Sequence, residues 1–112
     1  MKIFRKREIN PYSVSDKAVF RNVDETLTLY VRADAAALVV NLKKAQDYLS
    51  TLTDESTEEE KLKGARMIAQ ALFGNEQAEE LLEFYRDPLT VITACGIYFV
   101  TLAPKIAKAQ KK

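Results

Sequence analysis

Residues 26–49 read TLTLYVRADAAALVVNLKKAQDYL, and the spacing of apolar residues changes within them. In the first part, Leu27, Leu29 and Val31 alternate with threonine and tyrosine, which predicts a half-buried β-strand. From Asp34 onward the spacing becomes three and four residues, as on one face of an α-helix. The apolar positions with this helical spacing are Leu38, Leu42, Ala45, Leu49 and Leu52. A strand is therefore expected to lead directly into a helix that Asp34 caps.

The residues before this strand predict the other half of a hairpin. Residues 18–21 (AVFR) favour a strand, and residues 22–25 (NVDE) are compatible with a turn, so we expect a β-hairpin over residues 17–32. Residues 1–16 show no clear period and contain proline and small polar residues. We expect an extended arm or loop there, without the apolar run of a signal peptide.

A second helix is expected after a short break that follows the first. Ser56 and Thr57 precede Glu59 and Glu60 at the spacing of a capping box, so the helix begins there. Its apolar stripe ends at Gly74, where a glycine suits a left-handed C-terminal cap. The run of carboxylates over residues 54–60 lies beside this helix N-terminus, where negative charge is stabilising, and it lacks the glycine and spacing of a calcium loop.

Two more helices complete the expected fold. Asn75 is suited to cap a short third helix, and Asp87 followed by Pro88 is a typical start for a fourth. Pro104 is expected to kink or end that fourth helix. We therefore expect a single domain over residues 1–112, with an α+β, predominantly helical fold: an N-terminal β-hairpin followed by about four α-helices over residues 34–112.

Composition narrows the possible chemistry. The chain has 112 residues, no histidine, one cysteine, three glycines and a net charge of +1. Cys95 lies in an apolar stretch with no histidine to activate it, so we expect it in the core rather than as a nucleophile. No glycine-rich phosphate loop is present. The sequence thus predicts a protein that is not an enzyme, with no catalytic residue, no cofactor and no metal.

The fourth helical segment is apolar around most of its circumference. No charged residue lies between Asp87 and Lys105, yet this run is shorter than the roughly 20 residues of a membrane span and contains three threonines. A helix that is apolar all round is usually buried on all sides. Since three short helices and a hairpin offer limited cover, we expect part of this surface to need another chain, which could be a second copy completing a homodimer core.

The two ends of the chain are basic. Residues 1–32 hold seven positive and four negative side chains, and residues 88–112 hold four positive and none negative. An alternative function follows from this, a small nucleic-acid-binding or regulatory protein. It would use Arg5, Lys6 and Arg7, with Phe4 and Tyr12 as stacking groups. No nucleic-acid-binding motif accompanies them, so nucleic acid is the less favoured partner.

From about residue 17 onward the chain resembles a family of phage proteins. The features are a strand leading into RAD (residues 32–34), an acidic middle helix, and a C-terminal segment with RDP (86–88), IYF (97–99) and the basic PKIAKAQKK (104–112). These resemble the small tail-assembly chaperones of long-tailed bacteriophages and prophages in Gram-positive hosts. The resemblance implies a non-enzymatic protein of the bacterial host cytoplasm that binds and shields the tape-measure protein. A homo-oligomer of this chain is a separate expectation, from the apolar surface of the fourth helix.

If that function holds, the fourth helix is expected to contact the client. Tape-measure proteins expose long apolar helical stretches, and a helix surface with excess apolar area can shield them. We expect Tyr98 and Phe99 to act as anchors and the lysines beyond Pro104 as a charged rim. The candidate partner-binding residues are Ile92, Tyr98, Phe99, Leu102, Lys105 and Lys108.

Overall fold

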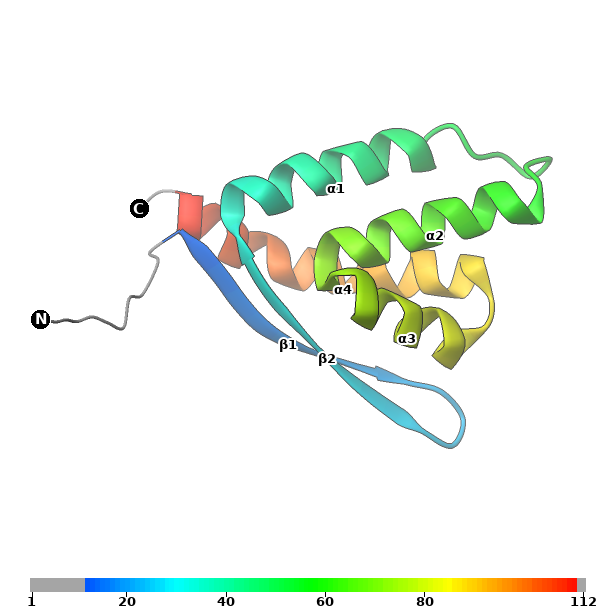
Figure 1. Cartoon of the computed structure of the whole chain (residues 1–112), viewed down its shortest axis with the longest axis horizontal. Coiled ribbons are helices and arrows are strands. Elements are labelled where there is room, and N and C mark those ends of the chain that lie inside the picture. The colour runs from blue at the N-terminus through cyan, green and yellow to red at the C-terminus, as the bar shows by residue number, and fades with distance from the viewer. Residues whose placement is uncertain (1–11, 111–112) are drawn as a thin grey trace, which may run out of the picture.

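A long β-hairpin opens the part of the chain that the computed structural model describes, residues 12–110 (Figure 1). β1 (Ser13–Arg21) pairs antiparallel with β2 (Thr26–Asp34), in a register that places Ser13 opposite Asp34 and Arg21 opposite Thr26. At the turn, the Asn22 side-chain oxygen accepts hydrogen bonds from the backbone N–H groups two and three residues later. The predicted hairpin and its turn are confirmed.

The first strand is longer than the sequence indicated. β1 begins at Ser13, so residues 13–16, expected in an arm or loop, belong to the hairpin. Val14 is buried while Ser13 and Ser15 point outward, which is ordinary strand alternation. The part of the expected arm over residues 1–11 lies outside the described residues.

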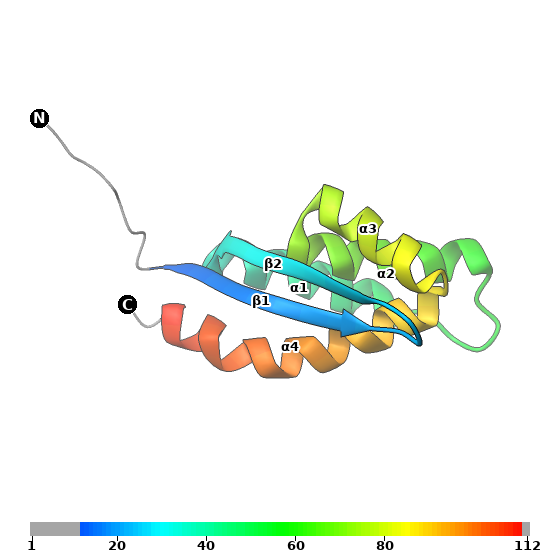
Figure 2. The same cartoon turned by 90° about the horizontal axis from the view of Figure 1, so that it is seen from below.

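Four helices follow the hairpin, as predicted. They are α1 (Ala35–Leu49), α2 (Glu58–Phe73), α3 (Asn75–Tyr85) and α4 (Pro88–Gln110). Figure 1 shows α1 and α2 side by side with the hairpin crossing the bundle, and Figure 2 shows β1 alongside α4 and β2 nearer to α3. This arrangement confirms an α+β, predominantly helical fold with an N-terminal hairpin.

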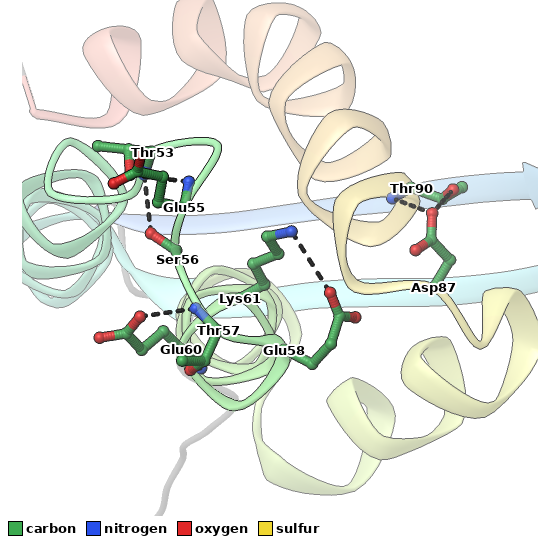
Figure 3. A network of polar contacts seen from close by, with 9 residues as sticks. All are labelled: Thr53, Glu55, Ser56, Thr57, Glu58, Glu60, Lys61, Asp87 and Thr90. Atoms are coloured by element: carbon green, nitrogen blue, oxygen red, sulfur yellow. Dashed lines mark hydrogen bonds and ion pairs between the residues drawn. The ribbon is translucent and has the colours of Figure 1, made fainter.

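The helix starts follow the expected capping chemistry. The Asp34 carboxylate accepts hydrogen bonds from two backbone N–H groups at the start of α1. Thr57 and Glu60 form a reciprocal capping box before α2, and the Asp87 carboxylate accepts from both the backbone and the hydroxyl of Thr90 at the start of α4 (Figure 3). Each interaction satisfies N–H groups that a helix start leaves without an intrahelical partner.

Three details of the helix ends differ from the expectations. α1 ends at Leu49, so Leu52 lies in the following turn. Asn75 is the first residue of α3 rather than its cap, because Gly74 ends α2 and also precedes α3 without a side-chain hydrogen bond. Gly74 has φ 84° and ψ 171°, a positive-φ conformation that only glycine adopts readily, though it is extended rather than left-handed helical.

The sequence predicts a kink or an end at Pro104, and α4 does not end there but continues to Gln110. A proline removes the hydrogen bond to the carbonyl four residues earlier, here that of Val100. Val100 is 70% exposed, so its carbonyl lies on the side of the helix that water reaches. The cost of the missing bond is therefore small at this position.

The core lies between the inner face of the hairpin and the four helices. Phe20 from β1 packs edge-on against Phe73 of α2, Tyr85 of α3 and Tyr98 of α4, with ring centroids 5.7–6.3 Å apart. Such edge-to-face pairs add to the stabilisation from area burial. One inward side chain of the hairpin thus joins three helices, which explains how two strands are stable here.

Candidate functional site

α4 has two faces of different character. Its inner face is buried in the core and consists of Val91, Cys95, Leu102, Ile106 and Ala109. Its outer face is exposed to solvent although it is apolar, with Leu89 at 51%, Ile97 at 65% and Val100 at 70% exposure. The described part of the protomer, residues 12–110, therefore covers only part of this helix, in line with the expectation from its composition.

Six exposed residues of α4 lie in one line opposite its inner face, which we call the outer strip, and the exposed Thr90 and Thr101 lie beside it. The strip residues recur at spacings of three and four residues, so they lie on one side of the helix. No charged residue occurs from Pro88 to Pro104. The outer strip consists of Leu89, Thr93, Gly96, Ile97, Val100 and Pro104, all exposed.

A separate apolar groove lies between α1 and α4, which we call the α1–α4 groove. Its volume is about 220 Å³, below the roughly 300–1,000 Å³ of typical small-molecule sites. The lining is apolar, and its few polar groups come from one lysine and two glutamines. The lining residues are Val39, Leu42, Lys43, Gln46, Phe99, Ala103, Ile106, Ala107 and Gln110. A groove of this size and chemistry suits an apolar side chain of another protein.

The predicted partner-binding residues are distributed over different parts of α4. Phe99 is half-buried and lines the α1–α4 groove. Ile92 is half-buried against the core, and Lys108 is exposed in the last turn, outside the groove lining. Leu102 is 0% exposed, so it belongs to the core and offers no surface to a partner. Because apolar residues surround most of the helix, their spacing did not show which side faces inward.

Tyr98 and Lys105 both contact Asp16 of β1. The Tyr98 hydroxyl and the Lys105 ammonium each donate a hydrogen bond of 2.5 Å to the Asp16 carboxylate. Burial raises the Asp16 pKa, but the two hydrogen bonds outweigh burial and hold this pKa below its ordinary 3.8. Burial and the nearby carboxylate raise the pKa of Tyr98. These two side chains therefore bind α4 to the hairpin within the protomer.

Cys95 has the character of a core residue. It is 0% exposed, and burial raises the pKa of its thiol to about 12, which leaves almost no thiolate at neutral pH. Within residues 12–110, no three acidic, cysteine or histidine side chains lie close enough together to hold a metal ion. That the protein is not an enzyme stays a prediction from its composition.

α4 is long and apolar enough, by length and composition alone, to cross a membrane, and only 22% of its most apolar window is buried. It spans 23 residues because it continues through Pro104, whereas the sequence suggested a shorter run. However, its inner face packs on α2 and β1, and Tyr98 and Lys105 bind Asp16. A helix crossing a bilayer would have to leave those contacts.

Most residues of the nucleic-acid alternative lie outside the described part of the chain. This applies to Phe4 and to the basic cluster over residues 5–7, while Tyr12 is exposed just before β1. That alternative stays a prediction.

Several residues with suitable surfaces were not among the candidates. In the groove this is Val39 on α1, and in the outer strip they are Leu89, Ile97 and Val100. The sequence showed that this segment is uncharged, but helical spacing could not single out the strip, because apolar residues surround most of the helix. No family model, no curated protein and no solved structure matches this chain.

Proposed function

We propose that this protein is a non-enzymatic assembly chaperone that holds an apolar helical segment of a client protein in its α1–α4 groove. The observation that carries the proposal is the groove itself, an apolar depression on the protomer surface with Val39 38% exposed at its edge. By the resemblance to phage tail-assembly chaperones, the client is a tape-measure protein.

Helix-in-groove binding explains how one surface serves a long client. An amphipathic helix places side chains at every third or fourth position into an apolar groove, and many sequences meet that requirement. Phe99 supplies an aromatic wall, and Lys43 lies at the rim where it can meet acidic residues of the client. Broad selectivity of this kind suits a chaperone, which must shield many successive apolar segments rather than one epitope.

Two neighbouring valines on α1 provide a matched test. Val39 lines the groove, whereas Val40 is 53% exposed and does not line it. Each can be changed to glutamate at an exposed helical position, where the cost to folding is small. Both variants are co-expressed with the tape-measure protein of the same phage or prophage genome, and the amount of soluble client that co-purifies is measured.

We expect Val39→Glu to reduce client capture at least about tenfold, because it places a charge in the apolar groove. Val40→Glu should capture the client as the wild type does. Capture that survives Val39→Glu, or that both variants lose equally, would overturn the proposal. Circular dichroism melts confirm that both variants are folded.

A further inference from the structure

The outer strip is symmetric about its own centre. Its residue numbers form three pairs that each add to 193, so the midpoint lies between Gly96 and Ile97. A two-fold axis at that midpoint places every strip residue of one helix opposite a strip residue of an antiparallel copy. The pairs are Leu89 with Pro104, Thr93 with Val100, and Gly96 with Ile97.

We propose that the outer strip is an isologous interface with a second copy of this chain, in which the two α4 helices pack antiparallel about this axis. The three exposed apolar side chains, at 51–70% exposure, would then be covered by one another. This inference does not rest on the proposed function, because the strip and the α1–α4 groove are different surfaces of α4.

Gly96 supports close packing at the centre of the strip. A glycine in a helix interior costs about 1 kcal/mol relative to alanine, so its position calls for a reason. Within residues 12–110 there is none, because a Cβ at Gly96 would meet no atom within 4 Å apart from its chain neighbours and its own helix backbone. In the antiparallel pair, Ile97 of the second copy lies over Gly96, and the missing side chain leaves room for it.

Charge favours the antiparallel direction. Asp87 precedes the uncharged segment at the N-terminus of α4, and Lys105 and Lys108 follow it near the C-terminus. Antiparallel packing places Asp87 opposite position 106 of the second copy, within one helical turn of Lys108, whereas Lys105 is paired with Asp16 of its own protomer. Parallel packing would place carboxylate against carboxylate and lysine against lysine. Antiparallel packing also brings the positive end of each helix dipole beside the negative end of the other.

The oligomeric state of the full chain tests the proposal. Sedimentation velocity over a wide range of concentrations should show a monomer–dimer equilibrium for the wild type. Ile97→Glu places two buried charges near the axis and should raise the dissociation constant at least about a hundredfold. Val40→Glu, at an exposed valine on α1, is the matched control and should dimerise as the wild type does.

Cysteine cross-linking tests the direction of packing. Ile97→Cys lies beside the axis and should form a disulfide-linked dimer on oxidation. Leu89→Cys should not cross-link to itself, since the two copies of position 89 would be about 22 Å apart along the helices. It should cross-link when mixed with Pro104→Cys. The wild type is the control, because Cys95 is buried.

Four results would overturn the proposal. The first is a wild type that stays monomeric at high concentration, and the second is an Ile97→Glu variant that still dimerises. The third is a Leu89→Cys variant that cross-links to itself. The fourth is evidence that the outer strip binds lipid instead of a second copy. The last is tested by flotation with vesicles of phosphatidylcholine and phosphatidylglycerol. A monomer that floats with vesicles and loses flotation through Ile97→Glu would identify the strip as a lipid contact.

Discussion

α2 and α4 both bury small and aliphatic residues on their inner faces, but the outer face of α2 is charged and that of α4 is apolar. α2 buries alanine, isoleucine and leucine, and its outer face carries glutamates and lysines such as Glu58, Glu59 and Lys63. α4 buries valine, leucine and isoleucine, and its outer face carries Ile97 and Val100 with no charge from Pro88 to Pro104. Water is a good solvent for the first outer face and a poor one for the second.

This difference separates folding from function. The inner faces of both helices are explained by the core of the protomer, and the outer face of α2 is explained by solvation and by its capping chemistry. Nothing within the described part of the protomer explains the outer strip of α4. A surface that is unfavourable in water and unnecessary for folding points to contact with another molecule.

The two glycines within helices differ in the same way: packing inside the protomer explains the glycine of α2 but not the glycine of α4. Gly64 of α2 is buried, and a Cβ there would lie 2.8 Å from Leu49 Cδ2 and 3.1 Å from Leu52 Cδ1. A side chain at this position would press on the ends of these two leucines. Gly96 of α4 has no neighbour of that kind among the described residues.

The largest expected effect compares the two faces of α4 directly. Leu102→Ala removes a fully buried side chain and should lower the free energy of unfolding by about 3 kcal/mol. Val100→Ala, two residues away on the outer strip, should change it by less than about 0.5 kcal/mol in the monomer. Urea unfolding of dilute protein, followed by circular dichroism, measures both. Equal losses would mean that the two faces are equally buried.

A smaller effect is expected at the contact that ties α4 to the hairpin. Asp16→Asn weakens the hydrogen bonds from Tyr98 and Lys105 and should cost about 1 kcal/mol at neutral pH. Because the folded-state pKa of Asp16 lies below 3.8, this contribution is present above the unfolded pKa and is lost as the pH falls through the folded one.

The difference between wild type and Asp16→Asn should therefore shrink below about pH 4. Urea unfolding at a series of pH values measures it. The control is Asp47→Asn on α1, whose pair with Lys43 is 64–69% exposed and should contribute little at any pH. A pH-independent difference at position 16 would contradict the assigned role of its carboxylate.

The smallest expected effects have opposite signs. Gly96→Ala adds helix propensity without any contact and should stabilise the monomer by about 0.5–1 kcal/mol. Gly64→Ala gains the same propensity but forces the ends of Leu49 and Leu52 to move, and we expect a net loss of about 0.5 kcal/mol. Thermal melts in the monomeric Ile97→Glu background separate these effects from dimerisation. If both changes stabilised the monomer, the glycine of α2 would not be required by packing, and the two helices would not differ in this respect.

Much of the fold could be predicted because its signals are local. The change of spacing at Asp34, the capping box at Thr57 and the Asp87-Pro88 start each act over a few residues, and each occurs in the structure. The start of β1 was missed because Asp16 occupies an inward position, where an apolar residue is usual. Its partners, Tyr98 and Lys105, lie more than 80 residues away in the sequence.

The candidate site was predictable only in part, because it too depends on contacts between residues that are far apart in the sequence. Composition showed that α4 has more apolar surface than a small domain covers, but the direction of its inner face depends on packing against α2 and β1. Leu102 was therefore selected although it is buried. The groove could not be foreseen, because Val39 and Phe99 meet only in the folded chain.

The most direct test of the account measures whether another polypeptide covers the outer strip. In Val100→Cys, the alkylation rate of the new thiol is followed at increasing protein concentration, and the buried Cys95 is the unreactive internal control. We predict fast labelling in dilute protein and protection at high concentration. A thiol protected even at high dilution would show that the protomer buries the strip itself, and one labelled equally fast at every concentration would show that no second copy covers it.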